Sequence, residues 1–325
     1  MAYMEAEGLT RYFLRRKKVR EAGPRRWLAR ERETVKALDH VSFQVEAGEL
    51  VGLIGPNGAG KSTTVKLLTG ILTPTEGACR VAGRVPWQER KQHVRELGVV
   101  FGQRTQLWWD VPIADSFDLL REIYDRPRND WAERLKQISA ALELEPLLRT
   151  PLRQLSLGQR MRAEVCGSLL HRPRLLFLDE PTIGLDAVSK LALRSFLKEE
   201  NRREGTTILL TTHDMEDMLA LCSRVMVLGH GKLLYDGALQ ELLRRYDTVH
   251  TLRCAFAGEV TPPPLPAGCV LRRDGDAIEV DYPPAQVPTG DMLDWVRRAG
   301  TLREMTLKEQ NVDQLIARMY QELAL

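Results

Sequence analysis

Apolar positions along the chain follow two different spacings. The segments VSFQV (41–45) and LVGLIG (50–55) have the composition of strands, and RLLFLDEP (174–181) and TTILLTT (206–212) are short, continuous apolar runs. Continuous runs are typical of parallel strands that are buried on both faces. Because helical stretches separate them, the pattern predicts an α/β domain.

A helical spacing fills the region between these runs. In IADSFDLLREIY (113–124) and WAERLKQISAALEL (131–144), apolar residues recur three and four positions apart. The region of about 112–172 is therefore predicted to be a helical subdomain inserted in the sheet domain.

The composition changes after about residue 246. TPPPLPAG (261–268) has the composition of a linker or turn, and it is followed by the strand-like CVLRR and AIEVDY and the helix-like DMLDWVRRAG and NVDQLIARMY. We predict a first domain over residues 1–246 and a small C-terminal α+β domain over 247–325.

Composition and charge narrow the possible partners and compartments. Of the 325 residues, 47 are Lys or Arg and 44 are Asp or Glu, so the formal net charge is only +3 and no nucleic acid partner is expected. The five cysteines have no paired spacing that would indicate disulfides or a zinc site, which favours a reducing cytoplasm. No apolar run approaches the roughly 18 residues of a bilayer crossing, and we expect a chain that is neither exported nor membrane-spanning.

A glycine-rich loop follows the strand at 50–55 and opens a helix. GPNGAGKST (55–63) fits the pattern of glycine, four residues, then Gly-Lys-Ser, in which backbone N–H groups surround phosphate oxygens at a helix N-terminus. The lysine would neutralise the outer phosphates, and the serine hydroxyl would ligate magnesium. The residues predicted to bind the nucleotide here are Gly55, Asn57, Gly58, Gly60, Lys61, Ser62 and Thr63.

Two acids end the apolar run LLFLDE. Asp179 is placed to hold the magnesium shell, and Glu180 is placed to orient or deprotonate an attacking water. The alternative is an acidic pair that merely ends a strand, and the phosphate loop upstream makes that alternative weaker.

Together these motifs resemble the ATP-binding subunit of ABC transporters over roughly residues 3–240. In that family LSLGQ (155–159) corresponds to the signature motif, which contacts the γ-phosphate of an ATP held by the opposite subunit. The resemblance implies a P-loop NTPase fold, the cofactors ATP and Mg²⁺, and a pair of nucleotide-binding domains formed by two copies of the chain. It assigns the signature contacts to Ser156, Gly158 and Gln159.

The resemblance extends to single residues outside these motifs. Gln103 matches a glutamine that contacts magnesium and water, Asp186 matches the D-loop aspartate, and His213 matches the switch histidine that acts with Glu180 in catalysis. Leu157 departs from the family, which commonly has glycine there, and its side chain must point away from the phosphate. The aromatic residue that stacks on adenine is expected to be Phe13, with Tyr12 as the alternative.

Two further segments suggest surfaces for partners. In QLWWDVP (106–112), we expect one of Trp108 and Trp109 to belong to the core and the other to be exposed until a membrane permease covers it. The basic stretch at 14–33 is either a solvated loop or, through Arg15, Arg16, Lys17 and Lys18, a surface near anionic lipid.

The resemblance implies an ATP hydrolase that powers a separate multi-spanning permease from the cytoplasmic side of the membrane. The stretch FGQRTQLWWD (101–110) is similar to a bacterial branch linked with export of viologens and other drug-like compounds. The alternative is a soluble ABC ATPase that acts on ribosomes or DNA. A glycine-rich kinase is disfavoured, because the signature and the switch histidine would then have no role.

Overall fold

The computed structural model describes residues 2–16, 32–102, 104–212, 214–246, 249–258, 260–274, 277–308 and 319–322. The chain divides into two compact units, Met1–Gly237 and Ala238–Leu325. Each unit has a hydrophobic core of its own among the described residues.

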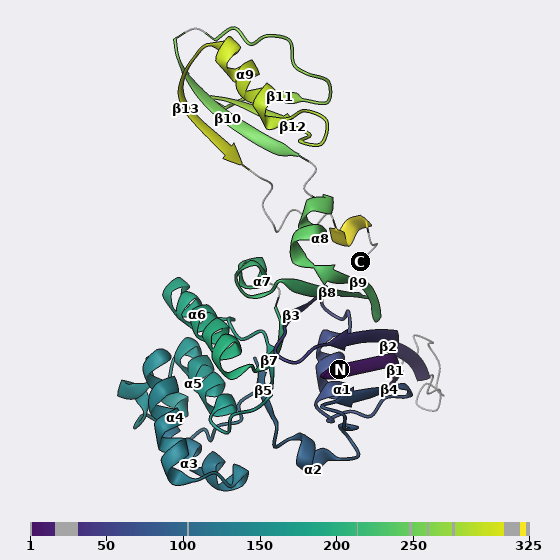
Figure 1. Cartoon of the computed structure of the whole chain (residues 1–325), viewed down its shortest axis with the longest axis vertical. Helices are drawn as coiled ribbons and strands as arrows, with labels where there is room; N and C mark the ends of the chain where they lie inside the picture. The colour runs from purple at the N-terminus through teal and green to yellow at the C-terminus, as the bar shows by residue number, and fades with distance from the viewer. Residues whose placement is uncertain are drawn as a thin grey trace, which may run out of the picture. The chain divides into compact units, whose positions relative to one another are not determined.

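A six-stranded sheet forms the centre of the first unit. Its strands are β3 (Leu50–Ile54), β5 (Leu97–Phe101), β6 (Leu175–Asp179), β7 (Thr207–Thr211), β8 (Arg224–Gly229) and β9 (Lys232–Ala238). Their spatial order is β5-β6-β7-β3-β8-β9, and the pairs β5–β6, β6–β7, β7–β3 and β3–β8 are parallel (Figure 1). The carboxyl ends of β3, β6 and β7 therefore lie at one edge of the sheet.

A second, three-stranded sheet packs on the same core. Its strands are antiparallel, in the order β2-β1-β4, and comprise β1 (Met4–Arg16), β2 (Arg32–Val45) and β4 (Glu76–Val81). Helix α1 (Lys61–Leu68) contributes Val65 and Leu68 to the core that joins both sheets. The phosphate loop between β3 and α1 is thus held by packing on both sides.

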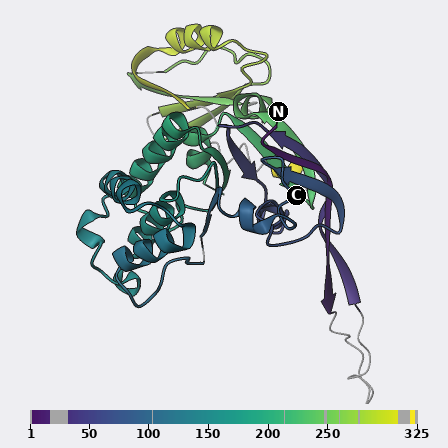
Figure 2. The same ribbon diagram turned by 60° about the horizontal axis from the view of Figure 1, so that its bottom comes forward.

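The remaining helices of the first unit form a layer beside the main sheet. Figures 1 and 2 show the teal helices of this layer grouped together, away from the purple strands of the second sheet. They are α3 (Ile113–Tyr124), α4 (Arg128–Ala141), α5 (Leu157–Leu169) and α6 (Ala187–Glu204). The unit also contains the short helices α2 (Arg90–His93), η1 (Glu145–Leu147), η2 (Leu152–Gln154) and α7 (Met215–Leu221).

Buried polar contacts tie this layer together. Arg134 of α4 forms an ion pair with Glu200 of α6, and both side chains are almost fully buried. His171, which follows α5, stacks on Tyr124, and its Nε2 lies 3.0 Å from the carbonyl oxygen of Leu97 in β5.

The second unit is a four-stranded antiparallel sheet with a helix on one face. The order is β11-β12-β10-β13, and alternate residues of β10 and β12 pack against α9. The elements of this unit are α8 (Leu239–Tyr246), β10 (His250–Ala257), β11 (Val270–Asp274), β12 (Ala277–Tyr282), α9 (Thr289–Ala299) and β13 (Thr301–Lys308).

All five cysteines are free thiols. Burial raises the pKa of every one of them, to about 12 for Cys79 and Cys222 and to about 11 for Cys254. Only Cys269 is partly exposed. Among the described residues, no helix combines the length and the apolarity that a bilayer crossing needs.

Candidate functional site

The glycine loop between β3 and α1 has backbone conformations that favour glycine at three of its positions. Gly55, Gly58 and Gly60 all have positive φ angles, which side chains disfavour. A Cβ at Gly55 would lie 2.2 Å from the carbonyl oxygen of Leu228, and one at Gly60 would lie 2.6 Å from Cδ2 of Leu38. Only glycine fits these two positions, so the loop is fixed against β8 and β2.

Lys61 begins α1 directly after the loop. Its Nζ donates to the carbonyl oxygens of Gly55 and Pro56, at 2.6 and 3.1 Å. Burial lowers the pKa of the Lys61 ammonium, and the carboxylates of Glu180 and Asp179 oppose that shift. The lysine is thus a buried cation beside the loop, where a phosphate would be attracted to it.

Asp179, at the end of β6, brings the loop and the sheet together. Its Oδ2 accepts a hydrogen bond from the Ser62 hydroxyl at 3.3 Å, and its Oδ1 accepts one from the hydroxyl of Thr211 at the end of β7. Hydroxyl and carboxylate oxygens are the ligands that magnesium prefers. No cluster of three or more His, Cys, Asp or Glu suited to a metal occurs in the described part of the chain.

Glu180 follows at a turn with an unusual backbone. Its φ is +54°, and its N–H donates to the Thr211 carbonyl oxygen at 2.9 Å. On the other side, Gly102 donates its N–H to the Asp179 carbonyl oxygen at 2.9 Å, and a Cβ at Gly102 would come within 2.8 Å of that atom. The backbone strain at Glu180 is therefore held from both neighbouring strands.

The segment LSLGQ caps helix α5. The Ser156 hydroxyl accepts the N–H of Gln159 at 3.2 Å, and the Gln159 side chain accepts the N–H of Ser156 at 3.0 Å. This capping box uses one lone pair of the serine oxygen and leaves its O–H group available to donate. Ser156 can therefore hold the helix start and still offer a proton donor to a phosphate.

Leu157 and Gly158 pack against the turn that precedes α6. A Cβ at Gly184 would lie 2.2 Å from Cδ2 of Leu157, and one at Gly158 would lie 3.0 Å from Cδ2 of Leu185. Asp186 then caps α6, accepting from the Ser189 N–H at 2.8 Å, and these bonds hold the pKa of its carboxyl low. The Leu157 side chain thus rests on Gly184.

The two candidate adenine-stacking residues lie next to each other on β1. Tyr12 pairs with Lys36 and Phe13 with Val35 across the β1–β2 ladder. Arg11 lies over the Phe13 ring at 5.0 Å, and the Lys36 ammonium lies over the Tyr12 ring at 5.5 Å. The ladder continues to Leu38, the residue that a Cβ at Gly60 would meet, so this part of β1 pairs with the strand that packs on the phosphate loop.

The segment after position 103 is tied to α5 by a buried acid. Glu164 accepts the Thr105 hydroxyl and, at 3.1 Å, the Gln106 N–H. Burial raises the pKa of the Glu164 carboxyl, and these hydrogen bonds oppose the shift. The segment is therefore anchored to the helix that Ser156 caps.

Both tryptophans of this segment are exposed, Trp108 by 40% and Trp109 by 48%. The expectation that one of them belongs to the core is wrong, because Leu107 fills the buried position in their place. The Arg160 guanidinium lies 5.6 Å from the Trp109 ring. Exposed neighbouring indoles on a loop are typical of a surface that a partner covers.

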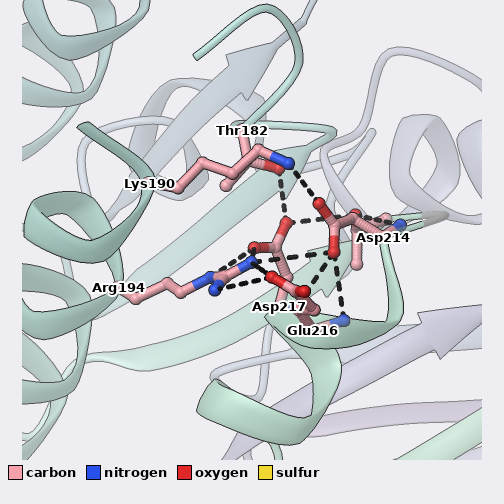
Figure 3. Close-up of polar contacts among 7 residues, drawn as sticks. Thr182, Lys190, Arg194, Asp214, Glu216 and Asp217 are labelled. Carbon is pink, nitrogen blue, oxygen red and sulfur yellow. Dashed lines mark hydrogen bonds and ion pairs between the residues drawn. The ribbon is translucent and has the colours of Figure 1, made fainter. Parts of the chain in front are cut away.

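Several predicted residues lie outside the described part of the chain. These are Gln103, His213 and the part of the basic stretch at 17–31, which contains Lys17 and Lys18. The residues on either side of 213 are described. Thr212 directly follows β7 and is buried. Asp214 caps α7 and forms an ion pair with Lys190 of α6 (Figure 3).

Comparison with known proteins identifies the group to which this site belongs. The family model described as "ABC transporter" matches residues 38–183. The ABC transporter ATP-binding protein NatA of Bacillus subtilis (strain 168) is 31% identical over 212 residues, which cover 65% of this chain and 86% of that protein. The chain belongs to the ABC transporter family. Binding and hydrolysis of ATP are the activities of its ATPase domain.

Other relatives within the ABC transporter family are named for different transported compounds. The methionine import ATP-binding protein MetN of Latilactobacillus sakei subsp. sakei (strain 23K) is 30% identical, over 81% of this chain and 75% of that protein. The probable multidrug ABC transporter ATP-binding protein YbhF of Escherichia coli (strain K12) is 34% identical over 208 residues. These residues cover 63% of this chain but only 35% of YbhF.

The solved structures agree on the ABC ATPase fold. The structure titled "Structure of ATP binding subunit of ABC transporter" superposes with a TM-score of 0.63 at 25% identity, covering 75% of this chain and 93% of that chain. The predicted α/β fold of a P-loop NTPase is therefore confirmed.

Sequence reasoning missed three polar residues of this ABC ATPase site. Thr211 supports Asp179, Glu164 holds the segment after position 103, and Asp217 of α7 accepts hydrogen bonds from Thr182 and Thr212. The signal for Glu164 was an acid within the largely apolar stretch AEVCGSLL (163–170), whereas DMEDMLAL (214–221) contains three acids and does not distinguish Asp217 from its neighbours. A buried acid of this kind needs partners, but its partners are distant in sequence.

Proposed function

We propose that this chain is the ATP-hydrolysing subunit of an exporter of small organic cations or drug-like compounds, whose permease is a separate polypeptide. The observation that carries the proposed ATP hydrolysis is the hydrogen bond from the Ser62 hydroxyl to Oδ2 of Asp179, at 3.3 Å. The buried Lys61 directly precedes Ser62. The proposal is supported by the glycine loop, the ammonium of Lys61 and the two oxygen-bearing side chains lying at one edge of the sheet.

Within one subunit, Lys61 and the loop N–H groups would bind the β- and γ-phosphates. Ser62 and Asp179, with Gln103, would hold the magnesium ion, which when bound draws negative charge from the phosphate oxygens. Glu180, helped by His213, would orient the attacking water and accept its proton. Phe13 would stack on the adenine.

The site is completed by a second copy of the chain. Ser156, Gly158 and Gln159 of one copy would contact the γ-phosphate held by Lys61 of the other, and Asp186 would lie at the same junction. The free O–H group of Ser156 and the N-terminus of α5 both favour an anion in that position. ATP would thus join two copies, and hydrolysis would release them.

The permease would cover Trp108 and Trp109 from the cytoplasmic side of the membrane. Their exposure, and the hydrogen bonds that join their segment to α5 through Glu164, support a surface that responds to nucleotide. Export is supported by the resemblance of residues 101–110 to the viologen-exporter branch. Because a methionine import protein is also among the relatives, the direction has to be measured by transport.

The test uses the Glu180→Gln variant, tagged and extracted from membranes in mild detergent with ATP–Mg²⁺. We expect hydrolysis to fall by roughly 10²- to 10⁴-fold while ATP stays bound, because only the general base is lost. A multi-spanning membrane protein should co-purify with Glu180→Gln. Lys61→Ala, which cannot hold the phosphates, is the control and should recover less of it.

Two outcomes would contradict the proposal. Unchanged hydrolysis in Glu180→Gln would remove its assigned role. Recovery of ribosomal or DNA-repair components, with nothing from the membrane, would favour the soluble ABC ATPase instead.

A further inference from the structure

A fully buried carboxylate, that of Asp217 in α7, joins three segments of the first unit (Figure 3). Its Oδ1 accepts from Nε of Arg194 at 2.6 Å. Its Oδ2 accepts from the hydroxyl of Thr182 and, at 3.3 Å, from that of Thr212. An ionised carboxylate only accepts hydrogen bonds, so all three donors are oriented toward it.

Each donor belongs to a different segment of the ATPase site. Thr182 lies two residues after Glu180, and Arg194 lies on α6, the helix that Asp186 caps. Thr212 directly precedes position 213. One carboxylate therefore holds together the three segments that carry the residues assigned to hydrolysis and to the junction between copies.

Thr212 is fixed on both sides of its hydroxyl. While it donates to Asp217, the same oxygen accepts the N–H of Asp214 at 3.0 Å. The hydroxyl thus links Thr212 directly to the N–H of Asp214. Asp214 is held in turn by Lys190 and, at 3.6 Å, by Arg194, both on α6 (Figure 3).

The cluster is sensitive to loss of the central charge. Thr182, Thr212 and Arg194 are all buried, so without Asp217 the guanidinium would lack its closest counterion and two hydroxyls would need new acceptors. A buried network whose members are all satisfied holds its geometry rigidly, and removing one member disturbs the others.

We propose that Asp217 is a positioning residue for ATP hydrolysis. It sets the spacing between the turn that carries Glu180 and Thr212, and it links both to α6 through Arg194. The proposal rests on the proposed function and extends it to a residue that does not touch the nucleotide. Displacing a reacting group by about 1 Å can lower a rate about 100-fold.

The test measures kcat and KM for ATP in the full-length Asp217→Asn variant, with rates normalised to bound ATP. Asparagine keeps the shape but lacks the charge and one acceptor oxygen. We expect kcat to fall by about 10- to 100-fold with KM within about twofold of wild type, because the phosphate loop is untouched. The matched control is Glu216→Gln, the adjacent acid on α7, which is 80% exposed and only 3.5 Å from the same arginine.

A double-mutant cycle separates positioning from general loss of stability. Thr182→Val removes one donor to Asp217, so Thr182→Val/Asp217→Asn should be no slower than the slower single variant. If Asp217→Asn does not fold, Thr182→Val and Thr212→Val are tested in its place. They too should lower kcat without raising KM.

A kcat for Asp217→Asn within twofold of the Glu216→Gln value would overturn the proposal. Additive effects of Thr182→Val and Asp217→Asn on kcat in the cycle would overturn it too. So would a wild-type kcat in both Thr182→Val and Thr212→Val. These results leave the proposed function standing as long as the wild-type chain hydrolyses ATP and Glu180→Gln does not. A wild-type chain without ATP hydrolysis would overturn both.

Discussion

At the scale of single residues, Leu157 and Gly184 are fitted to each other. The sequence indicates that Leu157 departs from the family and that its side chain must leave the phosphate side, but it does not say where the side chain goes. In the structure the Leu157 side chain packs directly on Gly184. A Cβ at position 184 would lie only 2.2 Å from Cδ2 of Leu157. A larger residue in the signature is thus matched by a glycine in the turn before Asp186.

Gly184→Ala should lower the free energy of unfolding by more than Gly205→Ala does. Both glycines have a positive φ near +70°, which costs alanine about 1–2 kcal/mol, but nothing lies within 4 Å of a Cβ at Gly205. The overlap with Leu157 should add about 1–3 kcal/mol in Gly184→Ala. Urea unfolding of both variants measures the difference.

Leu157→Ala is the check on this explanation. In the double variant Leu157→Ala/Gly184→Ala the extra loss should shrink, since the colliding Cδ2 is gone. An extra loss of the same size in the double variant would show that the overlap is not its cause.

Residues that sit at strand ends were the most predictable part of the site. Asp179 ends β6 and the loop that carries Ser62 follows β3, so parallel strands alone bring both to one edge of the sheet. Asp217 and Glu164 were not predictable, because their partners come from segments whose contacts depend on how helices pack. The tryptophan prediction failed because alternation along a strand does not apply to a turning loop.

At the scale of elements, a buried ion pair joins α4 to α6 in the helical layer. Periodicity predicts the helix that contains Arg134, but its apolar spacing does not reveal that Arg134 faces Glu200. Burial raises the pKa of the Glu200 carboxyl, and Arg134 opposes the shift. Removing either side chain would leave the charge of the other buried without its counterion.

Arg134→Met should destabilise the protein by about 3–5 kcal/mol, because it leaves a buried carboxyl without its cation. Arg134→Met/Glu200→Leu should recover much of that loss. The exposed pair Arg202–Glu199, 2.8 Å apart, is the control, and Arg202→Met should cost less than about 1 kcal/mol. A similar loss in Arg134→Met and Arg202→Met, measured by chemical unfolding, would contradict this account.

At the scale of the whole molecule, stability should depend on pH through His171. Burial lowers the pKa of its imidazole from the ordinary 6.5 to about 4, and Arg126 adds to the shift. The unfolded chain therefore takes up the proton first as the pH falls. The stability present above pH 6.5 should decline between about pH 6.5 and 4, by a total of about 3 kcal/mol from this group.

Unfolding free energies at pH 7 and pH 4.5 test this dependence. His171→Gln, which keeps a donor for the Leu97 carbonyl oxygen, should lose less stability than wild type over this interval. Equal slopes in wild type and His171→Gln would rule out His171 as the source.

The overall α/β architecture was predictable because buried parallel strands and amphipathic helices leave direct patterns in the sequence. The second unit was predictable only as a mixture of strands and helices. Its sheet order, with β13 beside β10, depends on pairing between segments far apart in the chain. Local patterns carry no record of such pairing.

The buried thiols give this protein built-in reporters of local unfolding. A thiol-specific reagent reacts only with a thiolate that it can reach, so Cys269 should be modified first. Cys79, Cys166 and Cys222 in the first unit and Cys254 in the second react only when their surroundings open. Their separate modification rates would therefore measure the opening free energy of each region in the unmutated chain, without any introduced probe.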